Sequence, residues 1–283
     1  MANSTFNIDD YNDSGVWDLI CEGQTKGVFQ LESQLGRSWA KRVRPRNIEE
    51  LAALISLIRP GCLKAFTEGK SMTQHYVDRK AGIDEVKYLH ESLKPILEET
   101  YGVLVYQEQS MKIAQQLAGF DLKEADSLRK AIGKKKADLM AEIKKQFLSG
   151  AKRKGIVDAT TAEEIFSWIE KSSRYAFNKS HAVSYAICAY WSAYAKAHYP
   201  LEFYCNYLVH SSSKIDPQLE VKQLVNDAKN NEIYINPPSI KAMNAKTDII
   251  DKEIYFGLLD VKTVGERQVD KFKQIIEDNE IRI

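Results

Sequence analysis

Four polar residues of four chemical kinds stand together in the stretch YAFNKSHAVSYA, residues 175–186. They bring an amide, an ammonium, a hydroxyl and an imidazole to one point: Asn178, Lys179, Ser180 and His181. Serine is a favoured N-cap, and the free amides of a helix start, with a lysine beside them, form a ready site for an anion. We therefore expect an anion-binding helix start here. The simpler alternative is that Ser180 only caps the helix, Asn178 closes the preceding turn and His181 rests on a neighbour.

A second candidate is the basic stretch LRKAIGKKK, residues 128–136, in which Gly133 separates two groups of cations. The cations before the glycine are Arg129 and Lys130, and those after it are Lys134, Lys135 and Lys136. Glycine lets the backbone come close to a ligand, and cations spaced along one line suit a chain of phosphates better than a single carboxylate. The alternative is a solvated lysine face whose cations complement the C-terminal end of a helix.

Charge and aromatic residues around these stretches favour a polyanionic ligand. The formal net charge is only +1, but residues 1–33 are acidic, whereas residues 123–154 are rich in lysine and arginine. Tyr175, directly before the polar quartet, is placed to stack on a base or a sugar. Most of the other aromatic residues are expected in the core.

Several kinds of chemistry have no support in the sequence. Neighbouring side chains on a helix diverge, so Ser180 and His181 do not form a nucleophile and base, and no GxSxG motif is present. The motifs GxxxxGK[ST], GxGxxG and HExxH are also absent. The cysteines form no CxxC pair and have no histidine cluster beside them: Cys21, Cys62, Cys188 and Cys205. We therefore expect no zinc site, no disulfide framework and a reducing compartment.

The elements that must position these residues are mostly helices. The chain has 283 residues, 44% of them hydrophobic, which is enough to bury a sizeable core, and helical signals dominate. Asn47 and Glu50 form a capping-box pattern for a helix that ends at Pro60 and Gly61. GVLVY, residues 102–106, is the only convincing strand in the first two-thirds of the chain. The sequence predicts a mainly α fold with a few short strands.

Both candidate sites are expected at helix ends. One helix stops at Gly119, and the next begins with Asp121 as cap and Glu124 as its partner, until Gly133 interrupts it before the lysines. Further helices are expected at roughly 137–150, from about 161, and at about 180–198, where Pro200 ends the last of them. The C-terminal part is expected to form a short strand, a turn and a helix.

The start of the chain has no basic segment followed by an apolar one, which a secretory signal would need. No stretch approaches about 18 continuous apolar residues, the length of a membrane-spanning helix. We expect a cytoplasmic protein with no membrane partner.

A series of longer motifs occurs in the order found in bacterial replicative DNA polymerases of family C. The motifs are GVFQLES (27–33), RPG (59–61), HESLKPILEETYGVLVYQEQ (90–109), IAQQLAGF, LRKAIGKKK, FNKSHAVSYA and KAHYPLEF. The chain resembles the fingers region of a DNA polymerase III alpha subunit, from about residue 8 nearly to its end. The resemblance implies a multi-helix fingers domain at 34–211, preceded by an acidic lead-in segment at 1–33 that follows the palm. It also implies a C-terminal helical segment at 212–283 with an incomplete helix-hairpin-helix-like end.

The resemblance also implies roles for the two candidate sites. Arg129 and Lys130 would hold the triphosphate of an incoming deoxynucleotide, with Lys134, Lys135 and Lys136 near phosphate or the template backbone. At the helix start, Tyr175 would pack against the nascent base pair and His181 would crowd the 2′ position of the sugar. The nucleotide and the primer end would be positioned by Asn178, Lys179 and Ser180.

The sequence departs from the family pattern in informative places. Lys130 stands where the family usually has a second arginine, which removes one bidentate guanidinium. In the turn KTVG, residues 262–265, Thr263 replaces the first glycine of the family's helix-hairpin-helix element. The palm's closely spaced aspartates are missing, since the acidic residues near the start resemble the link after the palm. We therefore expect no catalytic or metal-binding residue in this chain, and Mg²⁺ only through a palm partner.

These observations lead to one main hypothesis and its rivals. The chain is expected to be the fingers portion of a DNA-directed DNA polymerase, a nucleotidyltransferase, inactive alone and completed by a separate palm-bearing fragment. It would be either one polypeptide of a split enzyme or a fragment of a whole one. Its expected partners are dNTP and template-primer DNA, with a sliding clamp and other replisome proteins as further candidates. The rivals are a non-catalytic relative that binds DNA or the replisome, and a structural protein that kept only the fold.

Overall fold

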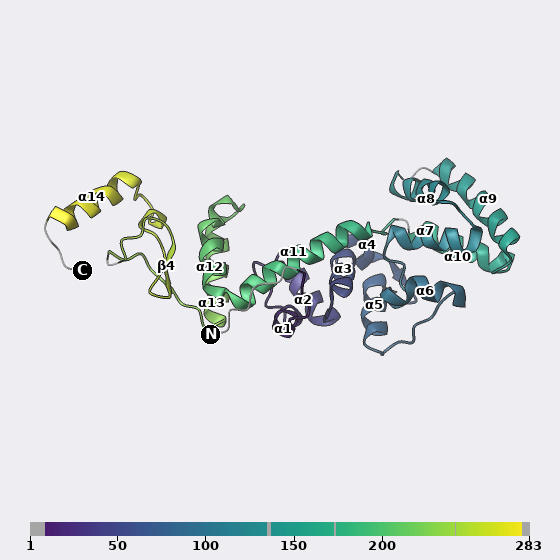
Figure 1. The fold of residues 1–283 in the computed structure, drawn as a ribbon, viewed down its shortest axis with the longest axis horizontal. Helices are drawn as coiled ribbons and strands as arrows, with labels where there is room; N and C mark the ends of the chain where they lie inside the picture. The colour runs from purple at the N-terminus through teal and green to yellow at the C-terminus, as the bar shows by residue number, and fades with distance from the viewer. Residues whose placement is uncertain (1–8, 135–136, 173, 241, 279–283) are drawn as a thin grey trace. The chain divides into compact units, whose positions relative to one another are not determined.

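The computed structural model describes residues 9–134, 137–172, 174–240 and 242–278 (Figure 1). Within these ranges the chain forms fourteen α-helices and five strands of two or three residues, which confirms the predicted mainly α fold. The first ten helices are α1 (Ser14–Cys21), α2 (Gln34–Val43), α3 (Ile48–Leu57), α4 (Pro60–Lys64), α5 (Met72–Lys80), α6 (Lys94–Leu97), α7 (Gln107–Ala118), α8 (Leu122–Lys134), α9 (Ala137–Lys154) and α10 (Ala159–Ser172). The others are α11 (Lys179–His198), α12 (Pro200–Val209), α13 (Pro217–Asn230) and α14 (Glu266–Asp278).

Packing divides the chain into two compact units. Unit 1 comprises Met1–Gln24 and Ser33–Tyr190, and unit 2 comprises Thr25–Glu32 and Trp191–Ile283. Helix α11 passes through the boundary, so its first part belongs to unit 1 and its last part to unit 2. These units reflect packing alone, and the three ranges implied by the resemblance stay a prediction.

One hydrophobic core cluster of unit 1 lies among helices α7 to α10, which pack together in Figure 1. Phe147 of α9 lies at its centre, with ring centroids 6.2 Å from Phe120 and 5.2 Å from Phe166. Gly150 lets α9 approach α7, because a Cβ at this position would lie 2.1 Å from the carbonyl oxygen of Ala118. Any larger residue there would force the two helices apart.

Three helix ends follow the predictions made from local sequence. Asn47 caps α3 by accepting a hydrogen bond from the backbone N–H of Glu50 at 2.8 Å. Asp121 and Glu124 form a reciprocal capping box at the start of α8, with distances of 2.7 and 2.9 Å. Gly119 ends α7 with a left-handed φ of 70°.

Two local predictions were wrong. Residues 102–106 form no strand, and the β-bridge recorded for them in the described structure is an isolated parallel one, between Tyr106 and Phe177. Strands β1 (Phe66–Thr67) and β2 (Lys70–Ser71) pair instead as a short antiparallel hairpin in unit 1. Gly133 does not interrupt its helix either, since α8 continues through it to Lys134. A single glycine costs a helix only about 1 kcal/mol, which packing easily outweighs.

Unit 2 combines α12 and α13 with a three-stranded sheet. Its strands are β3 (Ile235–Asn236), β4 (Asp248–Ile250) and β5 (Glu253–Tyr255), in the order β3-β5-β4, with β3 parallel and β4 antiparallel to β5. Then follow η4 (Leu258–Asp260), a turn and α14, as predicted for the C-terminal part. Buried residues of α12, α13 and β5 form its core, with Tyr204, Leu224 and Ile254 fully buried. In the part of the chain that the structure describes, no helix has the length and apolar character needed to cross a membrane.

Candidate nucleotide-binding site

The start of α11 is fixed to the start of α7, although 72 positions separate Lys179 from Gln107. The N–H of Phe177 donates to the carbonyl oxygen of Val105 at 2.9 Å, and the N–H of Gln107 donates to the carbonyl oxygen of Phe177 at 2.9 Å. These two hydrogen bonds place the polar quartet beside the first turn of α7. The quartet therefore lies on a rigid base formed by two helix starts.

Asn178, rather than Ser180, caps α11. The Oδ1 of Asn178 accepts from the backbone N–H of His181 at 2.8 Å, and its Nδ2 donates to the Glu108 carboxylate at 2.9 Å. The helix begins at Lys179, one residue earlier than predicted, and Ser180 is exposed in its first turn. The side-chain amide of asparagine can accept a hydrogen bond at its oxygen and donate one at its nitrogen. The contact with Glu108 therefore favours Asn178 as the cap of α11.

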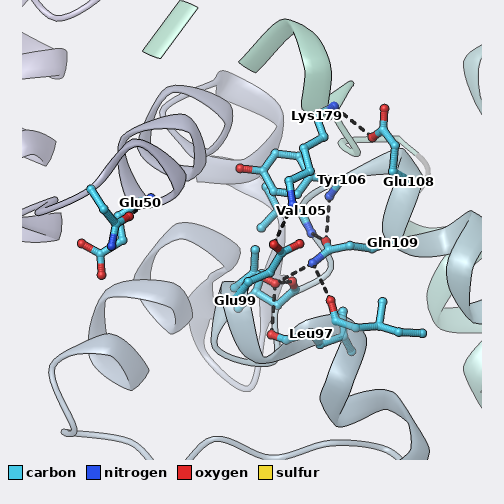
Figure 2. Close-up of polar contacts among 12 residues, drawn as sticks. Glu50, Leu97, Glu99, Val105, Tyr106, Glu108, Gln109 and Lys179 are labelled. Atoms are coloured by element: carbon cyan, nitrogen blue, oxygen red, sulfur yellow. Dashed lines mark hydrogen bonds and ion pairs between the residues drawn. The ribbon is translucent and has the colours of Figure 1, made fainter. Parts of the chain in front are cut away.

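Lys179 is held at both of its nitrogen atoms (Figure 2). Its backbone N–H donates to the Glu108 carboxylate at 2.9 Å, and its Nζ lies 2.6 Å from the Glu99 carboxylate. The Nζ also lies 5.6 Å from the centroid of the Tyr106 ring, which forms the floor of the site. The side chains of Lys179 and Glu99 keep 30% and 33% of their surface exposed, so a ligand can reach this ion pair.

Gln109 supports the site from below and was missed by sequence reasoning. Its buried amide oxygen accepts from the backbone N–H groups of Val105 and Tyr106, both at 2.9 Å (Figure 2). Its amide nitrogen, Nε2, donates to the hydroxyl of Thr100 at 2.8 Å. Burial raises the pKa of the Tyr106 hydroxyl, so the floor of the site stays neutral. The only sequence signal was a glutamine three residues after Tyr106, the capping-box spacing.

The remaining residues of the quartet region present rings and a hydroxyl to solvent. His181 is exposed, and its ring centroid lies 4.0 Å from that of Tyr185 and 5.4 Å from that of Phe177. Tyr175 is half-buried against Gly61, where a Cβ would lie 2.8 Å from the Cδ1 of the tyrosine ring. Only a glycine at this position lets the ring lie so close to the backbone.

The cations of α8 form a separate group around one carboxylate. The Nε and Nη2 of Arg129 donate to the Oδ1 of Asp126 at 2.9 and 2.7 Å, and the Nζ of Lys130 lies 2.8 Å from its Oδ2. The hydrogen bond from Lys130, and then that from Arg129, lowers the pKa of Asp126, so this carboxylate stays charged at neutral pH. Lys134 ends the helix, and its side chain, like Lys135 and Lys136, lies outside the described residues.

The two groups of cations do not contact each other directly. Among the described residues, no hydrogen bond or ion pair joins Arg129 or Lys130 to residues 178–181. Each group instead pairs with its own acid: Arg129 and Lys130 share Asp126, and Lys179 pairs with Glu99. Carboxylates in such exposed pairs hold cations weakly, so a more highly charged anion can replace them.

The described residues do not fit a magnesium centre. They contain no group of three or more His, Cys, Asp or Glu side chains able to hold a metal ion. Near the candidate site, Glu99 and Glu108 are engaged with Lys179 and Asn178. In the acidic opening, Asp13 caps α1 by accepting from the N–H of Val16 at 3.0 Å. The arrangement provides cations and aromatic rings, which suit phosphates and bases better than metals.

Comparison with known proteins gives one consistent result. The profile of the bacterial DNA polymerase III alpha subunit finger domain matches residues 3–155. The chain is similar to the DNA polymerase III subunit alpha of Aquifex aeolicus, with 43% identity over 90% of this chain and 21% of the relative. Similarity to the Staphylococcus epidermidis subunit is 39% over 95% of this chain and 24% of the relative. For the Escherichia coli K12 subunit it is 39% over 92% of this chain and 22% of the relative. The chain thus spans between a fifth and a quarter of the length of these relatives.

Proposed function

Because the chain belongs to the bacterial DNA polymerase III alpha subunit family and includes its finger domain, we propose that it binds an incoming dNTP and template-primer DNA during DNA replication. The observation that carries the proposal is the start of α11. There the partly exposed Lys179, whose Nζ lies 5.6 Å from the centroid of the buried Tyr106 ring, is followed directly by the exposed residues Ser180 and His181. A cation suits phosphate, while exposed rings suit a base or a sugar.

In this proposal the two groups of cations have different tasks. Arg129 and Lys130 leave Asp126 to bind the triphosphate, with Lys134, Lys135 and Lys136 near phosphate or the template backbone. Asn178, Lys179 and Ser180 position the nucleotide and the primer end. His181 crowds the 2′ position of the sugar, and Tyr175 packs against the nascent base pair. The exchange of a carboxylate for a phosphate is favoured because the phosphate carries more charge and more acceptor oxygens.

The catalytic step is assigned to a palm outside this chain. Two-metal phosphoryl transfer needs carboxylate ligands, and the described residues offer no such group. We propose that Mg²⁺ enters through a palm partner and that this chain alone does not extend a primer. The proposed protein is cytoplasmic, divided at 33 and 211 as the resemblance implies, with a sliding clamp and other replisome proteins as further partners.

One observation favours the rival, a non-catalytic relative that binds DNA or the replisome. Thr263 adopts a φ of 77° in the KTVG turn, the left-handed region in which β-branched residues are rare. The turn thus keeps a glycine-type conformation without a glycine. A DNA-binding turn retained despite its strain is compatible with a chain that binds DNA and no longer handles nucleotides.

Primer extension tests the proposal. The chain, a cognate palm polypeptide and their mixture are each supplied with primed DNA, Mg²⁺ and dNTPs. We expect activity only in the mixture, a loss of at least about tenfold with Arg129→Ala, since a charge-assisted contact is removed, and incorporation of ribonucleotides with His181→Ala. Arg153→Ala, an exposed arginine near the end of α9, is the matched control and should leave activity unchanged. A palm polypeptide that polymerises at full rate without this chain would contradict the proposal. An inactive mixture, together with salt-sensitive DNA binding by this chain, would favour the rival.

A further inference from the structure

One cation beside the start of α11 has no acidic partner. The guanidinium carbon of Arg59 lies 4.4 Å from the centroid of the Phe177 ring, and the residue is exposed. Among the described residues, no carboxylate forms an ion pair with this guanidinium. Arg129, Lys130 and Lys179 each contact an acid instead. Arg59 therefore contributes an uncompensated positive charge to this part of unit 1.

The turn that carries Arg59 is held close to the aromatic residues before α11. Pro60 occupies the first position of α4, which restricts the turn, and Gly61 lies directly against the Tyr175 ring. The turn thus meets one ring at Gly61 and the other at Arg59, on the two sides of Ala176. The backbone of Phe177 is itself bonded to residues 105 and 107, which holds in place the position that carries the ring.

Stacking leaves the hydrogen-bonding edge of the guanidinium available. A guanidinium that lies over an aromatic face is attracted by the ring and loses little of its hydration at the edge. Its N–H donors lie in the guanidinium plane and match two oxygens of a phosphate. A guanidinium held over a ring also loses less entropy when such a contact forms. Arg59 is thus pre-oriented for a phosphate rather than merely exposed.

The Phe177 ring connects Arg59 to the quartet. Its centroid lies 5.4 Å from that of His181 in an edge-on arrangement, and His181 continues the series to Tyr185. Only the Phe177 ring therefore separates a ligand that contacts His181 from the guanidinium of Arg59. We propose that Arg59 is a further phosphate-binding residue of this site, with its guanidinium stacked on Phe177. This inference rests on the proposed function, because that function places a nucleotide or a primer end at His181.

The phosphate can come from two sources, the phosphodiester backbone of template-primer DNA or the triphosphate of the nucleotide. Two binding measurements on the 283-residue chain distinguish them. In the first, a fluorescein-labelled primer-template is titrated at several salt concentrations. In the second, a fluorescent dATP is titrated without DNA. For the backbone source, Arg59→Ala weakens DNA binding about tenfold and reduces the salt slope by about 0.9. For the triphosphate source, it weakens dATP binding about tenfold and leaves the DNA slope unchanged.

Companion variants separate phosphate binding from structural effects. Arg59→Lys keeps the charge but loses the planar fork, so we expect about threefold weaker binding of the affected ligand. Phe177→Leu removes the ring beneath an intact Arg59 and should also weaken binding about threefold. Lys64→Ala removes an exposed cation from the same short helix and should change neither affinity. If Arg59→Ala lowers the melting temperature, the binding measurements with Arg59→Lys replace those with Arg59→Ala.

The outcomes also separate this inference from the function on which it rests. Suppose that Arg59→Ala binds both ligands with wild-type affinity while Arg129→Ala weakens nucleotide binding. This result would overturn the role of Arg59 and leave the proposed function standing. Binding of neither ligand by the unmodified chain would overturn both. Equal losses of affinity for Lys64→Ala and Arg59→Ala would also overturn the role of Arg59, because the general positive charge would then explain the effect.

Discussion

Two lysines on the same helix make the same contact in different surroundings. The Nζ of Lys179 lies 2.6 Å from the Glu99 carboxylate, and the Nζ of Lys196 lies 2.6 Å from the Asp227 carboxylate. The Lys179 side chain is 30% exposed, whereas the Lys196 side chain is 2% exposed. Equal distances therefore occur at very different degrees of burial. The comparison shows that burial, and not the length of an ion pair, separates a lysine that a ligand can reach from one that is enclosed in the fold.

The surroundings of Lys196 explain why it has no freedom to bind a ligand. Its Nζ also donates to the backbone carbonyl oxygen of Lys26 at 2.9 Å, which ties the segment at 25–32 to the rest of unit 2. The Asp227 carboxylate accepts a second hydrogen bond, from the hydroxyl of Tyr204 at 2.7 Å. Burial, and then this bond to Asp227, raises the pKa of Tyr204, so the tyrosine remains a donor. Lys196 and Tyr204 thus both hydrogen-bond the Asp227 carboxylate, and removal of Lys196 leaves this largely buried charge without its cation.

The largest expected effect is on the stability of unit 2. Lys196→Met should lower the free energy of unfolding by about 3–5 kcal/mol, because it leaves the Asp227 carboxylate largely buried without its cation. Lys179→Met is the matched control and should cost less than about 1 kcal/mol, as expected for an exposed pair. Urea denaturation of both variants measures the difference. Equal losses would contradict the distinction between the two lysines.

A smaller effect is expected on ligand affinity at the exposed lysine. Glu99→Gln removes the carboxylate that competes with phosphate for Lys179 and should tighten nucleotide binding about two- to fivefold, which corresponds to about 0.4–1 kcal/mol. Glu98→Gln, the same change at the exposed neighbouring residue, is the control. Titration with a fluorescent dNTP measures both affinities. Unchanged or weaker binding by Glu99→Gln would mean that Glu99 positions Lys179 instead of competing for it.

The smallest effect concerns the exposed pair around Asp126. Lys130 and Arg129 depress the pKa of this carboxyl below its usual value. The pair therefore stabilises the folded chain above the usual aspartate pKa, and this contribution is lost as the pH falls through the depressed value. NMR titration of the Asp126 carboxyl carbon should show the depressed pKa, and Lys130→Met should raise it toward the usual range. A titration that Lys130→Met leaves unchanged would contradict the assigned cause.

Local sequence predicted more of the fold than of the site. Asn47 and Asp121 were identified as caps because each bonds an amide three residues away, an interaction encoded within one turn. The same rule chose Ser180 at α11, and it failed because Glu108 favours Asn178 from another helix. The support from Gln109 also lay beyond local rules, since its partners converge only in the folded chain.

The amino-acid sequence by itself determined the family, the mainly α fold and most of the helix boundaries. These properties depend on residue order, hydrophobic period and interactions within one helical turn, which folding leaves unchanged. Only the tertiary structure decided that Lys179 is accessible and Lys196 is buried, although both are lysines on one helix. It also placed Arg59 on Phe177, across 118 positions of the sequence. Such pairings depend on how distant helices pack, so neither residue type nor spacing reveals them.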